Sequence, residues 1–418
     1  MRYGTSVALL LLLVTSRILQ GTPVPWIAEL EAAAILLALS FTIWYHIVRP
    51  LVSRDATIHL LDGYLLLLLL LPFYSAWRSL EVFGQPLIYG ILAQRSVWLV
   101  AVVLFTVIAI RNNKITFRHI ERALIVSSWL SLGAYTFCFA FLDPSNYTDY
   151  PMIVSGSVKS GFRFSFETVF IVFGALYYFA LAVISRAVLL WLAFLPFAFY
   201  LLVLDQKRSL LLAIAISVTM LVIKFTDLPG KVFHLFVGGA CIFFILFLFY
   251  IVLPETLFAF VDRFGQAFDV LVTGSEGSDD SSNARIQEAL KALPYVKANL
   301  LLGNGDLSAQ WQSGFESVFG YFFISDIGFI GGLFVFGIVG LVILYGMYWF
   351  FLRSTKLAKY TGTEHRPLLM SMYGSILVAF FQTFVKAQFF LGPAISAMFI
   401  ALFWLLTRNN IVRHMAKR

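Results

Sequence analysis

The residues of this chain best suited to chemistry lie close together in its one long polar segment, residues 254–326. This segment carries Arg263, Arg285, Glu316 and the glycine pair of Gly303-Asn304-Gly305. Guanidinium groups bind phosphate oxygens through a planar fork of donors, and they stay charged close to lipid. A carboxylate at a membrane boundary is partly desolvated, which raises its pKa and suits it to act as a general base. These residue types indicate chemistry on an anionic substrate, with a carboxylate that moves a proton.

Three more basic residues outside this segment are candidates for the same site. Lys207 and Arg208 stand in a short polar turn, and Arg163 stands just before an apolar stretch. Basic residues at a membrane surface also reach lipid headgroups or pair with a nearby acid. For a single arginine such as Arg163 that second interpretation stays open, whereas the motifs around Arg208 and Arg285 favour a binding site.

Other acidic and glycine residues allow more than one interpretation. Asp326 is the rival of Glu316 for the role of base, although the helix dipole also favours an acid at a helix start. Gly303 and Gly305 allow either a close approach of backbone N–H groups to a ligand or a sharp turn. The acidic run Glu276–Asp280 lacks the spacing of a calcium-binding loop. We therefore expect no metal and no other cofactor.

The composition identifies the class of protein that must position these residues. Of the 418 residues, 60% are hydrophobic and 12% are charged, whereas soluble domains are roughly half apolar and about a quarter charged. Runs such as 232–253 are long enough to cross about 30 Å of hydrocarbon at about 20 residues each. Their apolar residues form continuous blocks and do not alternate, which excludes a β-barrel. The sequence predicts an all-α, polytopic membrane protein.

Reading the apolar blocks against their flanks predicts about twelve spans. They are residues 4–21, 27–48, 57–76, 89–110, 123–142, 165–185, 187–204, 209–224, 232–253, 327–352, 367–386 and 390–407. The net charge is +8, and the loops rich in Lys and Arg all fall on one face of this arrangement. By the positive-inside rule that face is cytoplasmic, and so are both termini. Because no aromatic-basic module accompanies the charge, nucleic acid is not an expected partner.

The spans divide the chain into three parts. Residues 1–253 form nine transmembrane helices, 254–326 form a long periplasmic loop that holds the site residues, and 327–418 form three transmembrane helices and a cytoplasmic tail. Two charged residues fall inside spans, Asp62 and Arg95, and are costly in lipid unless they are paired. We expect them to pair with each other or with Arg17.

The long loop is predicted to contain two amphipathic helices that lie on the membrane. In the second helix, Ser281 or Ser282 is the cap and Pro294 disturbs the later turns. In the first helix, apolar residues recur at helical spacing, namely Phe258, Val261, Phe264, Phe268 and Leu271. Between the two helices, residues 272–284 are expected to form a mobile lid over bound substrate.

The order of these motifs resembles the O-antigen ligase and polymerase superfamily, which includes Wzy-type polymerases of bacterial surface polysaccharides. An arginine in a short outer turn precedes a span in Lys207–Leu211, and an arginine begins an amphipathic helix in Asn283–Ala292. An apolar run then enters Gly-x-Gly in Leu301–Gly305, and a polar pair precedes the span that contains Asp326–Gly331. Ligases of the superfamily typically carry a histidine where this chain has Glu316-Ser317, and this departure favours a polymerase.

The resemblance implies a GT-C-like glycosyltransferase that works without metal and inverts the anomeric centre. A growing glycan would move from undecaprenyl pyrophosphate to a hydroxyl of a lipid-linked repeat unit at the periplasmic face. Arg208 and Arg285 would stabilise charge on the leaving pyrophosphate, and Glu316 would take the acceptor proton. The implied substrate-binding residues are Arg163, Lys207, Arg263, Gly303 and Gly305. A chain-length regulator is an implied partner, besides the lipid-linked oligosaccharide and the bilayer of the bacterial inner membrane.

Three other functions compete with the polymerase. One is a ligase of the same class that transfers the glycan to the lipid A core. Another is a transporter or flippase of lipid-linked sugars, which should show charges at mid-membrane and paired, broken spans; most spans here are uniformly apolar instead, and no internal repeat is evident. A non-catalytic assembly factor would leave the outer arginines without a role. The polymerase is the preferred prediction.

Overall fold

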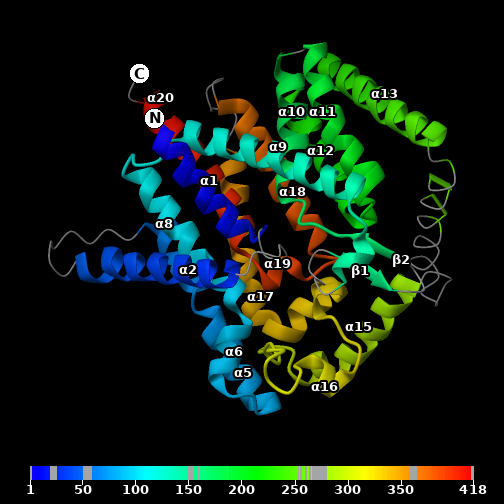
Figure 1. Ribbon diagram of the computed structural model, residues 1–418. Coiled ribbons are helices and arrows are strands. Elements are labelled where there is room, and N and C mark those ends of the chain that lie inside the picture. The colour runs from blue at the N-terminus through cyan, green and yellow to red at the C-terminus, as the bar shows by residue number, and fades with distance from the viewer. Residues whose placement is uncertain are drawn as a thin grey trace.

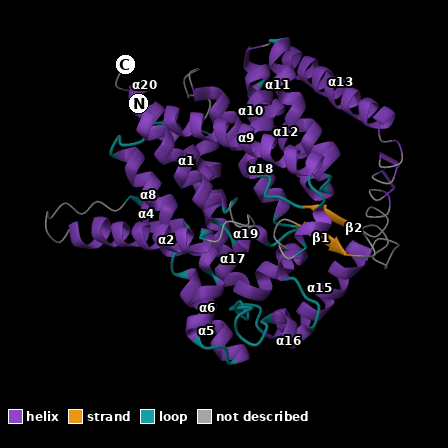
Figure 2. Cartoon of the chain, in the orientation of Figure 1, coloured by secondary structure: helices purple, strands orange, loops and turns teal. Residues whose placement is uncertain are grey.

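The computed structural model of the chain describes residues 2–18, 26–49, 59–148, 154–157, 161–185, 187–252, 280–356 and 365–415, with a few positions between 254 and 265. The described residues form a helical protein whose long apolar helices pack side by side (Figure 1). One short two-stranded hairpin interrupts this pattern (Figure 2). The predicted class, an all-α membrane protein, is confirmed apart from this hairpin.

The helices follow one another along the chain with few long connections. They are α1 (Arg2–Ser16), α2 (Ile27–Ile43), α4 (Leu60–Leu68), α5 (Leu71–Phe83), α6 (Leu87–Ala93), α7 (Arg95–Trp98), α8 (Val100–Arg111), α9 (Phe117–Phe141), α10 (Val169–Ser185), α11 (Val188–Phe199), α12 (Arg208–Phe225), α13 (Leu228–Val252), α15 (Asp280–Ala298), α16 (Phe315–Phe319), α17 (Gly328–Thr355), α18 (Arg366–Gln382), α19 (Gln388–Leu391) and α20 (Ala394–Met415). The short helices η1 (Trp44–Val48), η2 (Pro144–Tyr147), η3 (Tyr200–Asp205) and η4 (Ile324–Ile327) and the strands β1 (Val154–Ser157) and β2 (Gly161–Phe164) complete the described elements.

Among the described residues, five helices are long and apolar enough to cross a membrane. They are Ile27–Val48, Leu60–Phe83, Phe117–Phe141, Arg208–Phe225 and Ile324–Thr355. A sixth span results if α6 is joined to α7 and α8, which meet it at a bend of 61°. Shorter apolar helices, such as α1 and α10, pack against these spans. Helix length and composition therefore support five or six spans, and the number twelve stays a prediction.

The charged residues inside the bundle are paired, but not with the predicted partners. Asp62 on α4 is almost fully buried and forms an ion pair with Arg111 at the end of α8. Arg17 pairs instead with Glu31 on α2, at 3.5 Å. The expected pairing of Asp62 with Arg95 or Arg17 is wrong because Arg95 starts the helical run that Arg111 ends. Sixteen residues of helix separate the two arginines by about 24 Å.

The basic ends of several helices meet at one end of the bundle. Arg111, Arg353 and Arg408 come from three loops that the positive-inside rule places on one face, and they lie close enough to repel one another electrostatically. At the same end, Arg366 donates to the carbonyl of Phe225 at 3.2 Å. The first residues of α1 and the last of α20 also lie near each other, as the N and C labels show (Figure 1).

The hairpin changes the predicted start of the sixth span. Phe164 stacks on Phe166, which in turn stacks on Tyr135 of α9, and Phe162 and Phe164 lie two positions apart along β2. This period of two fits a strand better than a helix. The predicted helix start at residue 165 is therefore wrong, because α10 begins at Val169.

The second predicted helix of the long loop is confirmed as α15, but its predicted cap is wrong: the helix already begins at Asp280, so Ser281 and Ser282 lie inside it. Pro294 also lies inside the helix, which continues to Ala298. Lys291 fixes this helix to the chain that follows it, because its ammonium group donates to the carbonyls of Phe319 and Tyr321 at 3.0 Å each. The first predicted helix and the proposed lid lie largely outside the described residues.

Candidate functional site

A cavity of about 620 Å³ lies where several helix ends converge. Its wall takes residues from the end of α1, the segment between β2 and α10, the start of α12, η4 and the break between α18 and α20. All of these are the helix ends that the predicted topology places on the outer face. The charged residues of the wall are Arg17, Glu167, Lys207, Asp306, Asp326 and Lys386. With three basic and three acidic side chains in its wall, the cavity suits a polar ligand.

Lys207 is held in the wall by a short and constrained turn. The last turn of the preceding helix widens into η3, and Gln206 then adopts a left-handed conformation with φ of 49°. The Lys207 ammonium lies 2.9 Å from Asp205 and donates to the carbonyl of Phe166 at 2.8 Å. Asp205 is buried and accepts no other hydrogen bond among the described residues. The lysine thus compensates a buried carboxylate while it faces the cavity.

Asp326 and Lys386 are brought together by the backbone. The N–H of Ala387 donates to the carbonyl of Ser325 at 2.8 Å, and these residues are the neighbours of the two charged side chains. Lys386 interacts favourably with Asp326 and Glu167, and unfavourably with Lys207 and Arg285. The site therefore contains a mixed set of charges, in which several cations are close enough to act on one ligand.

Arg285 on α15 is not part of the cavity wall, but it lies close enough to Lys386 of the wall to interact with it electrostatically. It shares a helix face with Glu288, three residues later, and their charges attract. Glu288 is buried, and its carboxylate accepts from the Phe323 N–H at 3.0 Å. Burial raises the pKa of Glu288, and nearby Asp326 raises it further, while this hydrogen bond and Arg285 oppose the change. The contact holds η4, and with it Asp326, against α15.

The Gly303-Asn304-Gly305 loop supplies the hydrogen bonds that are missing at a break in α17. Gly337 has a φ of 60°, which interrupts the helix, so the carbonyls of Phe334 and Val335 lose their usual partners four residues on. The N–H groups of Asn304 and Gly305 donate to these carbonyls at 2.7 and 3.0 Å. The freed N–H groups of the second half of α17 donate in turn to carbonyls of Leu300 and Leu301 at 3.0 and 3.1 Å. Irregular backbone is stable at this position because its polar groups are satisfied by protein.

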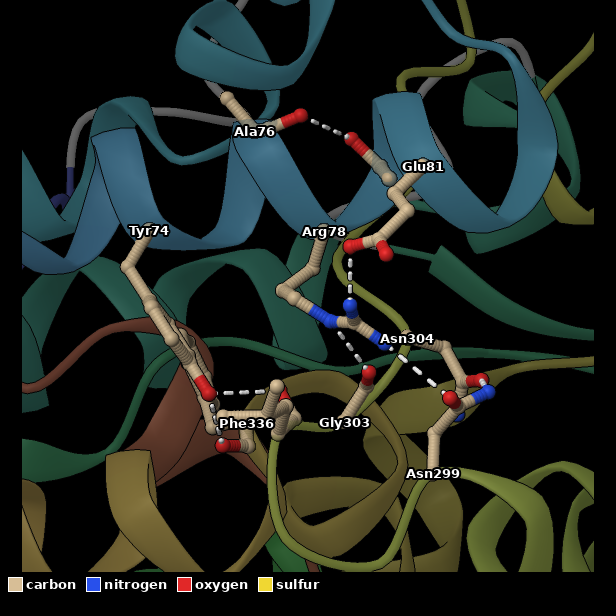
Figure 3. Close-up of polar contacts among 10 residues, drawn as sticks. Tyr74, Ala76, Arg78, Glu81, Asn299, Gly303, Asn304 and Phe336 are labelled. Atoms are coloured by element: carbon tan, nitrogen blue, oxygen red, sulfur yellow. Dashed lines mark hydrogen bonds and ion pairs between the residues drawn. The ribbon is translucent and has the colours of Figure 1, made fainter.

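A buried arginine on α5 binds this loop on the side opposite α17. Figure 3 shows Arg78 of α5 directed between Glu81 and the loop. Its guanidinium forms an ion pair with Glu81 and donates to the Gly303 carbonyl at 2.9 Å and to the Asn299 side chain at 3.1 Å. Asn299 donates to the side chain of Asn304 at 2.8 Å. The glycines therefore meet protein backbone on both sides, and their structural role is to let the loop fit between α5 and α17.

Replacing Gly305 with alanine is expected to destabilise the protein strongly. The new Cβ would lie within 3.0 Å of backbone atoms of Ser75 and Ser79, at a φ of 81° that alanine rarely adopts. The matched control is Gly84→Ala, because Gly84 has a similar φ of 75° but open space around it. Thermal unfolding of the detergent-solubilised protein should show a much larger loss of Tm for Gly305→Ala. Equal losses would contradict the tight fit described here.

Asp306 follows the glycine loop and enters the cavity wall. Its carboxylate accepts from the amide of Gln94 at 2.7 Å. Gln94 stands at the bend between α6 and α7, which is where the helix must break to present this side chain. Burial raises the pKa of Asp306 to about 7, although the hydrogen bonds from Gln94 and the Leu307 N–H oppose the change.

The structure places the predicted site residues in several different positions. Lys207 lines the cavity, and Arg208 follows it as the first, half-buried residue of α12. Arg163 is exposed on β2, and Glu316 is exposed on α16, so neither belongs to the cavity wall. Asp326, the rival of Glu316, does line the cavity. Arg263 lies outside the described residues.

Four charged residues of the wall were not predicted as site residues, namely Arg17, Glu167, Asp306 and Lys386. Lys386 was counted as the end of a span, although a lysine on the outer side already departs from the positive-inside rule. Asp306 directly follows the Gly-x-Gly motif, and this position is the sequence signal that could have identified it as a site residue. The grouping of Arg17 and Glu167 comes from tertiary packing, because they are far apart in the sequence.

Comparison with known protein families gives a match for the central part of the chain. Residues 192–345 match the family model described as O-antigen ligase. This match confirms the predicted resemblance over these residues, which include Lys207, Arg285, Asp306 and Asp326. A search of curated proteins gave no match. The family includes glycosyltransferase-like ligases and polymerases, so the match supports an enzyme that handles glycans.

Proposed function

We propose that this protein is a polysaccharide polymerase of the bacterial inner membrane. It transfers a growing glycan from undecaprenyl pyrophosphate to a lipid-linked repeat unit, with inversion and without metal. The observation that carries this proposal is the cavity that holds Arg17, Lys207 and Lys386, with Arg285 close to Lys386. Two of these four residues, Lys207 and Arg285, lie within the segment that matches the O-antigen ligase family.

The cations account for the difficult part of this reaction. When the bond between the anomeric carbon and the pyrophosphate breaks, negative charge grows on the leaving oxygen. Fixed cations in a partly dehydrated cavity stabilise that charge because they need no reorganisation. Lys207 and Lys386 supply this charge from the wall and Arg285 from outside it, while Arg208 supports the turn beside Lys207. Arg163, which is exposed on β2, would contact the glycan or the lipid headgroup.

The proposed orientation agrees with the distribution of charge along the helices. The basic residues Arg111, Arg353 and Arg408 meet at one end of the bundle, and the cavity lies among the opposite helix ends. We place the basic end and both termini in the cytoplasm. In this orientation the cavity faces the periplasm, where a chain-length regulator would contact the glycan.

The polymerase is preferred over a ligase because Glu316-Ser317 replaces the histidine typical of ligases. Glu316 is the base that the family resemblance implies, although it is exposed outside the cavity wall, and Asp326 is an alternative carboxylate that lines the wall. A transporter of lipid-linked sugars remains the alternative of a different class. The break in α17 is a feature that transporters also show, but here the loop from 300 to 305 fills it.

The deciding experiment is the length distribution of surface polysaccharide in a deletion strain. Loss of the ladder with the single-repeat product retained identifies a polymerase, and complementation with the intact gene should restore the ladder. Complementation with Glu316→Gln tests whether this carboxylate is needed. Loss of all surface glycan, single repeats included, would indicate a ligase or flippase, and an unchanged ladder would overturn the proposal.

A further inference from the structure

We infer that Asp306 is the group that accepts the proton of the acceptor hydroxyl, with Gln94 as its positioning residue. This inference rests on the proposed glycosyl transfer and adds the residue that activates the acceptor. It differs from the choice of Glu316, which is exposed on α16 outside the cavity wall. It also differs from the choice of Asp326, whose carboxylate is paired electrostatically with Lys386.

The position of Asp306 is fixed through its backbone and not only through its side chain. Its N–H donates to the hydroxyl of Ser75 at 3.0 Å, and its carbonyl accepts from the amide of Gln85 at 2.9 Å. Gly305, just before it, packs against the backbone of α5. The residue is thus held between α5 and the glycine loop. Such a fixed position suits a catalytic group.

The Asp306 carboxylate can accept a further hydrogen bond. It receives hydrogen bonds from Gln94 and from the Leu307 N–H, whereas an ionised carboxylate has about four lone-pair positions. The donor from Gln94 favours the ionised form and aims the group. Since Asp306 also lines the cavity, a sugar hydroxyl bound there can reach a remaining lone pair.

The side chains that hold Asp306 in place are uncharged, although Asp306 lines the same cavity wall as Arg17, Lys207 and Lys386. Ser75, Gln85 and Gln94, which contact it, carry no charge. The titratable groups on the elements packed around it are Tyr74, Arg78, Glu81, Tyr89 and Arg95, and Arg78 pairs with Glu81. Burial, and no neighbouring acid, is therefore the main cause of its raised pKa, about 7. A base with this pKa accepts a proton at neutral pH and releases it again afterwards.

The transfer forms one carbon–oxygen bond and breaks another. The acceptor oxygen attacks the anomeric carbon of the donor sugar, and its proton passes to the Asp306 carboxylate as the new carbon–oxygen bond forms. The bond from the anomeric carbon to the pyrophosphate oxygen breaks, and its electron pair leaves with undecaprenyl pyrophosphate, whose charge faces Lys207 and Lys386. Asp306 then loses its proton to solvent. No oxidant, metal or further reactant takes part.

The test measures chain growth by the purified protein on lipid-linked repeat units between pH 5.5 and 9. Asp306→Asn keeps the size of the side chain and an acceptor for Gln94, and we expect it to lower the transfer rate by about 10²- to 10⁴-fold. Asp306→Glu should keep the pH dependence at a reduced rate. Asp306→Asn should fold well. The raised pKa of Asp306 means that its ionised form destabilises the folded state above the ordinary pKa of aspartate, and asparagine cannot ionise.

The pH dependence of the transfer rate in Gln94→Ala distinguishes a positioning role of Gln94 from a purely structural one. Removing its hydrogen bond raises the pKa of Asp306 further, so the acidic limb of the rate profile should move to higher pH. A wild-type rate for Asp306→Asn would overturn the inference, and so would an unmoved limb in Gln94→Ala. If the wild-type protein itself forms no polymer, the proposed function fails; if it does and only these variants disagree, this inference alone fails.

Discussion

Replacing Lys386 with methionine is expected to lower polymer formation by about 10²- to 10³-fold, the usual effect of removing one group that stabilises transition-state charge. Lys386 lies in the cavity wall beside Asp326, and it interacts with Lys207 and Arg285. Methionine keeps most of the length of the side chain but removes the charge. Lys386→Arg should retain a large part of the activity, because the guanidinium also binds phosphate. Chain growth on lipid-linked repeat units is the measurement.

The control for this substitution is Lys297→Met. Lys297 is exposed near the end of α15 and outside the cavity wall, so its loss removes the same charge from the predicted outer face without changing the site. Its activity should equal that of the wild-type protein. Equal losses in both variants would show that overall charge matters and would contradict a specific role for Lys386.

The second large effect is expected at Lys207, where stability and activity must be separated. Lys207→Met leaves the buried carboxylate of Asp205 without its ion-pair partner. Breaking a buried pair from one side costs about 3–5 kcal/mol. The single variant should therefore lose both Tm and activity.

The double variant Lys207→Met/Asp205→Asn separates the two roles. Asparagine removes the unpaired charge, so the double variant should recover most of the lost Tm. Its polymer formation should stay low if Lys207 acts on the pyrophosphate. Asp205→Asn alone, which keeps the lysine, should stay active. Recovery of activity together with stability in the double variant would show that Lys207 only compensates Asp205.

The helical class was predictable because hydrophobic blocks report directly on burial in lipid. The helix at α15 was predictable for a different reason, since its apolar residues keep helical spacing within a polar segment. The hairpin at Val154–Phe164 was missed because its period-two pattern is short and adjoins a long apolar helix. The cap predicted at Ser281 or Ser282 was wrong because α15 already begins at Asp280.

The site was predictable in kind and only partly in membership. Lys207 and Asp326 stand near motifs, and both line the cavity. Arg17 and Lys386 reach the same cavity from opposite ends of the chain, and no local pattern indicates that they meet. Gly303 and Gly305 were recognised, but their use could not be read from sequence. That use depends on the break at Gly337, against whose backbone the loop packs.

The most direct test of the central claim is the product formed by the purified protein in lipid nanodiscs. The reaction contains undecaprenyl-pyrophosphate-linked repeat units as both donor and acceptor, and the products are separated by length. We predict glycans of several repeats that remain on the lipid, and their loss in Lys386→Met. Absence of chain growth, with transfer appearing only when lipid A core is added, would contradict the polymerase and identify a ligase.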